Sequence, residues 1–174
     1  MLRREFLATA AAVPAAAAMK PIPIIDTHIH LFDPRRPQGI PWPPKTAKFY
    51  KPTLPADYRA LTKSLGIVGA IEVECSPWFD DNQWVLDVSE KDTIMVGYIG
   101  NLEPGKPEFG KQLERFSKNK LFRGIRYGYL WDRNLRDELK KPEFIAGLKL
   151  LASGGYTLDS ANPTVTLLED LIQI

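Results

Sequence analysis

Residues 22–31 read IPIIDTHIHL, and this stretch decides how the rest of the chain is interpreted. An apolar run leads into His28 and His30, which are the only two histidines of the sequence. In a β-strand, residues i and i+2 point to the same face, so both imidazoles would project into one space. Neutral imidazole is a good ligand for zinc and related divalent metals. The pair therefore indicates a metal or catalytic site, with surface histidines or hydrogen-bonded core histidines as the alternative.

The position of this pair favours a functional site. The strand expected over residues 22–30 is apolar on both faces, which is typical of a buried parallel strand. The histidines come at its carboxyl end, where α/β folds gather their ligands. We therefore expect His28 and His30 to face a ligand site.

The composition suits a single globular domain. Of the 174 residues, 44% are apolar, which is enough for a core, and 25% are charged. The net charge of +2 is too small to indicate nucleic acid or an anionic membrane as a partner, so we expect a small-molecule substrate. Many of the 15 prolines lie between residues 34 and 55, which predicts a long ordered loop around Trp42.

Residues 1–18 resemble a twin-arginine export signal. Arg3 and Arg4 precede a Phe-Leu pair and an apolar stretch that ends in small residues suited to cleavage. That stretch is too short to span a membrane, so we expect an exported, periplasmic protein without a membrane anchor, whose mature domain is residues 19–174. The alternative is an alanine-rich helix. Cys75 is the single cysteine, and we expect it to be a buried apolar residue rather than a nucleophile.

Strand-like and helix-like segments alternate along the mature chain. Strands are expected over residues 22–30, 68–74, 95–100, 122–127 and 156–160, and helices over residues 56–65, 81–91, 108–118, 143–152 and 163–174. This order predicts an α/β fold with a parallel sheet and right-handed crossovers. The sheet is either an open doubly wound sheet or part of a (β/α)8 barrel. No Gly-x-Gly-x-x-Gly motif follows a strand, so dinucleotide binding has no support.

Three motifs resemble the amidohydrolase superfamily, in the amidohydrolase-related branch that includes sugar-lactone and pyrone-dicarboxylate hydrolases. Residues 25–34 (IDTHIHLFDP) resemble the opening strand of that branch, and residues 122–126 (FRGIR) resemble its fourth strand. Residues 72–78 resemble the second strand and the start of the loop after it. The resemblance covers residues 22–174 and implies a TIM-like (β/α)8 barrel with its site at the carboxyl ends of the strands.

The resemblance also implies that part of the family pattern is missing. Members run to nearly twice this length, and about five of the eight βα units are expected here. The family places a histidine on the sixth strand and an aspartate on the eighth, but no histidine follows His30. We therefore expect a partial barrel that is the amino-terminal part of a longer protein, a truncated gene product or a split barrel. A second half-barrel or homo-oligomerisation would cover the unpaired sheet edges.

The resemblance assigns chemistry to the histidine pair. His28 and His30 would hold a divalent metal, zinc or manganese, which polarises a carbonyl and activates water. The aspartate of the eighth strand would be the general base. In a metal-free mode, which some members use, the histidines would instead hydrogen-bond the developing oxyanion or the attacking water.

Polar and aromatic residues at the strand ends are candidates for binding the substrate. These candidates are Arg126, Glu74, Asn101, Asp159, Trp42 and Trp78. Arg126 is preferred over Arg123 because it lies nearer the carboxyl end of its strand, where a guanidinium can bind a substrate carboxylate or hydroxyl cluster. Trp42 and Trp78 lie in mouth-side loops and could stack on a sugar ring or cover the site. Salt bridges or packing between loops are the alternative roles.

These features support three functional interpretations. The first is an amidohydrolase-type hydrolase that acts on a lactone or a similar C–O or C–N bond of a small carbohydrate or carboxylated substrate. The second is a metal-dependent decarboxylase of the same family, which would release CO2 from an aromatic or enoic acid. The third is a catalytically incomplete fragment or subunit that needs the other half of the barrel.

Overall fold

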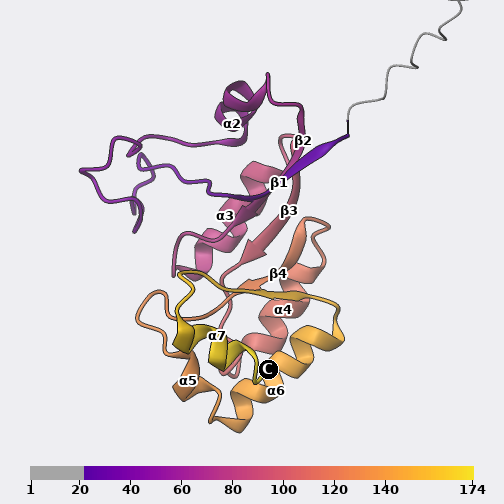
Figure 1. The fold of residues 1–174 in the computed structure, drawn as a ribbon. Helices are drawn as coiled ribbons and strands as arrows, with labels where there is room; N and C mark the ends of the chain where they lie inside the picture. The colour runs from indigo at the N-terminus through magenta and orange to yellow at the C-terminus, as the bar shows by residue number, and fades with distance from the viewer. Residues whose placement is uncertain (1–21) are drawn as a thin grey trace, which may run out of the picture.

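The computed structural model describes residues 22–174, so the export signal expected over residues 1–18 lies outside the described residues. Five strands alternate with helices along the chain (Figure 1). The elements are β1 (Ile24–Ile29), α2 (Pro55–Thr62), β2 (Ile67–Val73), α3 (Phe79–Ser89), β3 (Met95–Gly100), α4 (Phe109–Ser117), β4 (Phe122–Arg126), α5 (Leu135–Glu138), α6 (Pro142–Ser153), β5 (Thr157–Asp159) and α7 (Val165–Leu171). The predicted elements are all present, with ends shifted by a few residues, and α5 is an additional one.

The strand order decides between the two expected sheet types. The five strands are parallel and lie in the order β1-β2-β3-β4-β5, so each crossover steps in the same direction. A doubly wound sheet reverses its direction at a switch point, whereas a barrel does not. Helix α3 contacts β3, α4 contacts β4, and α6 contacts β5, as in a ring of βα units. The predicted partial TIM-like barrel is confirmed.

The core lies between the sheet and its outer helices. Helix α4 buries Phe109, Leu113 and Phe116 on one side, as its sequence spacing predicts. Phe116 stacks on Phe122 of β4, with 6.2 Å between the ring centres, and Tyr98 of β3 belongs to the same cluster. These contacts fix the middle strands, whose carboxyl ends carry much of the candidate site. Within residues 22–174, no helix has both the length and the apolar composition needed to cross a bilayer.

The expectation that the first strand is buried on both faces is wrong for the described residues. Ile24 is 48% exposed and Ile25 is 50% exposed, although both belong to the apolar run. The reason is that β1 lies at the edge of the sheet and pairs with β2 alone. Only its carboxyl end, from Ile29 onward, is buried against neighbouring elements.

Two helical glycines give a matched test of how closely this shell is packed. An added Cβ at Gly147 in α6 would lie 2.2 Å from the backbone oxygen of Pro104, whereas at Gly110 in α4 its nearest neighbour is 3.6 Å away. We expect Gly147→Ala to destabilise the fold by about 1–3 kcal/mol through overpacking. Gly110→Ala should be neutral or stabilising by up to about 1 kcal/mol. Urea unfolding measures both, and an unchanged midpoint in Gly147→Ala would contradict this packing.

Candidate functional site

The candidate site is built from the carboxyl ends of the strands. Because the strands are parallel, the residues that end them share one edge of the sheet. His28 lies near the end of β1 and His30 follows that strand, while Glu74 follows β2. Arg126 and Asp159 are the last residues of β4 and β5 and are paired neighbours in the sheet. The parallel arrangement therefore brings together residues as far apart in the sequence as His28 and Asp159, which are separated by 131 positions.

His30 is held by the neighbouring strand. Its Nδ1 lies 2.7 Å from the carbonyl oxygen of Val73. A carbonyl can only accept a hydrogen bond, so Nδ1 carries the proton and Nε2 keeps a free lone pair. Burial lowers the pKa of His30 and so favours the neutral imidazole, which is the form that binds metals. The hydrogen bond to Val73 has the opposite, smaller effect on this pKa. The ring of Trp42 packs edge-on against it, with 5.2 Å between ring centres.

Arg126 connects the first strand to the last two. Its Nε donates to Asp159 Oδ2 at 2.7 Å, and one terminal nitrogen lies 3.0 Å from His28 Nε2. The other terminal nitrogen lies 3.5 Å from the backbone oxygen of Glu74. The guanidinium is buried and its charge is balanced by Asp159. Arg123 is exposed and reaches the Val96 carbonyl instead. The structure therefore brings Arg126, rather than Arg123, to the histidines.

An open pocket of about 510 Å3 lies against His30, Glu74 and Arg126, within the range of about 300–1,000 Å3 that is typical of ligand sites, and His28 is not among its lining residues. Its walls come from the ends of β1, β2 and β4 and from the loops that follow β4 and β5. The lining residues are His30, Trp42, Glu74, Cys75, Arg126, Tyr129, Leu130, Trp131, Asp132, Ala161 and Asn162. Of the predicted substrate residues, Trp42, Glu74 and Arg126 line this pocket.

The remaining predicted residues have different surroundings. The side chain of Asp159 touches the pocket's guanidinium and is 35% exposed. Asn101 is buried, where its amide donates to the Ser76 carbonyl at 2.6 Å and its side-chain oxygen accepts from Arg133 at 2.6 Å. Trp78 stands before α3, half-buried and outside the pocket lining. Asn101 thus ties loops together, and Trp78 is not brought to the histidines.

Trp131 is a pocket residue that the sequence reasoning missed. Its indole Nε1 donates to Glu74 at 3.1 Å, and its backbone has φ of 60°, a conformation that costs an L-residue about 1–2 kcal/mol. Glu74 also accepts from the backbone N–H of Ser76 at 3.0 Å, while burial raises its pKa. An aromatic residue in a loop after a strand was the signal that singled out Trp42. Applied to the loop after β4, the same signal identifies Trp131.

The family can now be assigned. A family model described as amidohydrolase matches residues 25–157, which is more than half of the chain. The chain belongs to the amidohydrolase family. The resemblance predicted from the sequence motifs is thus confirmed. Among curated proteins, this amidohydrolase is 25% identical over 103 residues to L-fucono-1,5-lactonase of Burkholderia ambifaria, a match that covers 59% of this chain and 35% of the relative.

Other relatives give the same picture. The uncharacterized protein y4mH of Sinorhizobium fredii is 26% identical over 166 residues, with 81% of this chain and 54% of that protein covered. A zinc-bound amidohydrolase from Burkholderia multivorans superposes with a TM-score of 0.73 at 19% identity, covering 86% of this chain and 52% of that one. A probable 2-pyrone-4,6-dicarboxylic acid hydrolase from Acinetobacter baumannii, with citric acid bound, has a TM-score of 0.63 at 19% identity, covering 88% and 53%.

The amidohydrolase chain therefore spans about a third to about a half of the length of these relatives. The two solved structures share its fold, and the described strands correspond to part of their longer chains. The activity and substrates of a whole protein that contains this chain are accordingly a matter for proposal.

The histidine pair fits a divalent metal. The two rings are 5.0 Å apart between centres and nearly perpendicular, at 88°. Two imidazoles bound to one tetrahedral zinc at about 2.0–2.1 Å have ring centres about 5 Å apart, so the observed separation suits a shared ion. His30 presents a free nitrogen, whereas the Nε2 of His28 contacts Arg126 and would have to exchange that contact.

Glu72 is the most perturbed acid near the site. It is fully buried, and burial together with the negative charge of Glu74 raises its pKa well above the usual range, although the Leu31 backbone partly opposes this. Neither carboxylate oxygen has a hydrogen-bond partner among residues 22–174. Burial also raises the pKa of the Cys75 thiol, which is partly buried and lies 3.6 Å from the Leu31 carbonyl oxygen, to which it donates.

The shift of Glu72 predicts a pH-dependent gain for Glu72→Gln in the metal-free protein. A carboxyl whose pKa is raised by folding stabilises the fold least at high pH, because ionisation is disfavoured there. The variant should match the parent below about pH 4.5 and become more stable by about 1–3 kcal/mol as pH rises through the raised pKa. Urea unfolding with a chelator present measures this difference.

The control for that measurement is Glu114→Gln in α4, where the Glu114 side chain is 74% exposed. Its effect should stay within about 0.5 kcal/mol at every pH. A Glu72→Gln variant that loses stability as the pH rises, relative to the parent, would contradict the assigned environment of Glu72.

Proposed function

We propose that this chain forms the amino-terminal half of the active site of a hydrolase that opens a lactone in a small carboxylated or polyhydroxylated substrate. One observation carries the proposal: the guanidinium of Arg126 lies 3.0 Å from His28, beside the pocket that His30 lines. A cationic anchor next to a metal-type histidine pair suits a substrate that has both a reactive carbonyl and an anionic or hydroxyl group. A named lactonase relative and a citrate-bound hydrolase structure support this substrate class.

Each residue of the half-site has a defined task in this proposal. His28 and His30 would hold a divalent metal, which supplies polarisation of the lactone carbonyl and acidification of bound water when present. The Val73 carbonyl keeps His30 in the tautomer that leaves Nε2 free. Arg126 orients the substrate, and Asp159 balances its charge. Without a metal, the same two imidazoles would hydrogen-bond the developing oxyanion or the attacking water.

Trp42, in the loop after β1, and Trp131, in the loop after β4, both line the pocket. Both are flat apolar surfaces on which a sugar ring can stack. The family resemblance places the general base on an eighth strand, which is not among the five strands of residues 22–174. Hydrolysis by this half-site is therefore proposed for the whole protein that contains the chain.

The anchoring role of Arg126 is tested in that whole protein by Arg126→Lys. Lysine keeps the charge but cannot donate to Asp159 and a substrate carboxylate together in the same fork geometry. We expect kcat/KM for a carboxylated lactone to fall about 10- to 100-fold, the value of one or two charged hydrogen bonds. Acid release on lactone opening, followed with a pH indicator, measures it.

Arg123→Lys is the matched control, because Arg123 is exposed on the other side of the strand and should leave the rate unchanged. A panel of sugar lactones, carboxylated pyrones and aromatic acids separates the remaining readings. Release of CO2 without lactone opening would replace the hydrolase proposal with the decarboxylase alternative. No turnover of any panel member by the folded whole protein would reject both.

We also propose that residues 1–18 direct the protein through the twin-arginine route to the periplasm. The support is the sequence alone: an arginine pair, a Phe-Leu pair and an apolar stretch with a small-residue end. Arg3→Lys combined with Arg4→Lys should retain the protein in the cytoplasm, since the route reads the arginine pair. Cell fractionation measures this, and normal periplasmic recovery of the double variant would refute the proposal.

A further inference from the structure

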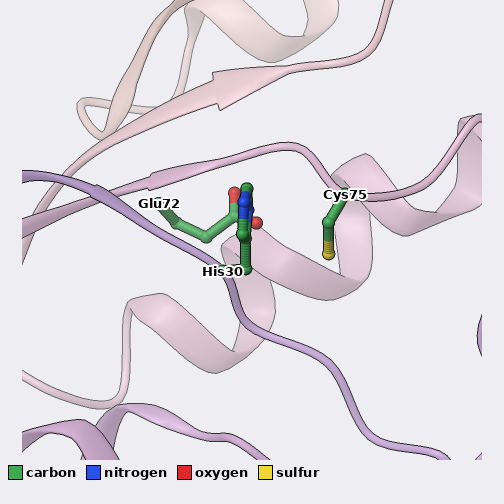
Figure 2. A group of neighbouring side chains, drawn as sticks. All are labelled: His30, Glu72 and Cys75. Atoms are coloured by element: carbon green, nitrogen blue, oxygen red, sulfur yellow. The ribbon is translucent and has the colours of Figure 1, made fainter. Parts of the chain in front are cut away.

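Three metal-type donors of different chemistry meet beside the histidine pair. His30 follows β1, Glu72 belongs to β2, and Cys75 comes shortly after β2. An imidazole nitrogen, a carboxylate oxygen and a sulfur from these residues lie within 4.8 Å of one another. Figure 2 shows the His30 ring beside the Glu72 carboxylate, with Cys75 on the segment that continues from β2. The pairing of Ile29 with Glu72 fixes this juxtaposition across the two strands.

Within this group of three donors, Glu72 has no role in the hydrolysis proposed above. Its side chain is fully buried, and neither of its oxygens finds a hydrogen-bond partner among residues 22–174. A buried acid in this state costs free energy, through desolvation of its charge or through an unused donor and acceptor. Buried charges in proteins are normally paired or coordinate a metal. A cation against the Glu72 oxygens would remove the cost.

His30 makes a hydrogen bond that is typical of metal-binding histidines. Histidines that bind metals commonly donate their other ring N–H to a carbonyl or carboxylate, which fixes the ring and its tautomer. The bond between His30 Nδ1 and the Val73 carbonyl, at 2.7 Å, is of this kind. The Val73 carbonyl therefore fixes the ring and the tautomer of His30 as an outer partner rather than as a ligand.

The surroundings leave room for an ion and favour positive charge. A cavity of about 10 Å3 borders Glu72 and Cys75, which is about the room that one water-sized species needs, and Cys75 also lines the larger pocket to which His30 belongs. Glu74 and Asp81 also line it. Arg36 forms an ion pair with Asp81 at 2.5 Å. The other two acidic residues of the lining, Glu72 and Glu74, do not share this cation.

We propose that His30, Glu72 and Cys75 together bind one divalent cation, and that this cation is zinc in preference to manganese or magnesium. The inference rests on the proposed function, since it shares His30 with the metal of that site. It adds Glu72 of β2 and Cys75 of the segment after β2 as ligands of that same ion. Thiolate with imidazole suits zinc, whereas manganese and magnesium prefer oxygen ligands. Ligands at about 2.0–2.3 Å from a tetrahedral ion stand about 3.3–3.8 Å apart, so donors that lie within 4.8 Å of one another need to close by up to about 1.5 Å.

Cobalt(II) substitution tests this on the full chain after treatment with a chelator. Cys75 is the single cysteine, so a near-ultraviolet charge-transfer band from thiolate to cobalt can come from this residue alone. We expect one cobalt per chain with that band, and its loss in Cys75→Ser. Glu72→Gln is nearly isosteric and should weaken zinc binding by at least about 100-fold, because removing a ligand costs more than removing an outer partner, which costs about 10- to 100-fold.

Glu114→Gln, at an exposed position in α4, is the matched control and should bind zinc like the parent, with circular dichroism verifying the fold of every variant. Cobalt binding without the band, or a band that persists in Cys75→Ser, would overturn the thiolate assignment. Equal zinc affinity in Glu72→Gln and the parent would overturn the carboxylate assignment, and this variant decides the case if Cys75→Ser does not fold.

The outcome for the proposed function is read separately. A folded protein that binds neither zinc nor cobalt overturns this metal site. If the whole protein still opens lactones in that metal-free state, the hydrolase proposal stands without it. A protein that binds cobalt with the expected band but opens no lactone would support the site and reject the lactonase proposal.

Discussion

The parallel pairing of β1 with β2 is the constraint on which the site depends. In that register Ile29 pairs with Glu72, and the next residue, His30, donates to the carbonyl of Val73. The side-chain period of a strand is two, so a slip of one residue would turn His28 and His30 to the opposite face. The hydrogen bond from His30 is thus a side-chain contribution to the same register that the backbone ladder sets. The tautomer of His30, a candidate metal ligand, therefore depends on the correct pairing of β1 with β2.

Charge balance extends this constraint to the other strands. Arg126 is a buried cation placed against His28, and a lone cation there would oppose a metal ion at the histidines. Asp159, its neighbour in the sheet, accepts from the guanidinium at 2.7 Å and offsets that charge. On the other side lie the carboxyl groups of Glu72 and Glu74, which border the small cavity beside Cys75 and whose pKa values are raised by burial. A guanidinium at the end of β4 thus lies at the same sheet edge as the carboxyl groups that follow β2 and end β5, an arrangement that would let an anionic substrate group and a metal ion occupy neighbouring positions.

Sequence reasoning could find the parts that depend on local pattern. Strand and helix alternation follows from spacing, and the histidine pair and Arg126 follow from their place at strand ends. It could not find the His30, Glu72 and Cys75 group, because that depends on the register between two strands and on the turn after Val73. It also could not place Trp131, whose position depends on a left-handed backbone conformation in the loop after β4. Trp78 met the same criteria as Trp42 and yet does not line the pocket; it is the residue that immediately precedes α3.

The one overturned feature of the fold shows why local pattern and burial can disagree. The run that opens β1 is apolar on both faces, as is typical of a strand inside a closed parallel barrel, yet Ile24 and Ile25 are about half exposed at a sheet edge. An apolar edge with unpaired backbone groups is prone to add another strand. The solved amidohydrolases with this fold are about twice as long as the part that this chain matches, and in a closed barrel a further strand lies against the first. The apolar start of β1 therefore suits a complete barrel. The position of His30 at the other end of the strand depends on the register of β1 with β2, which is present in the five-stranded sheet.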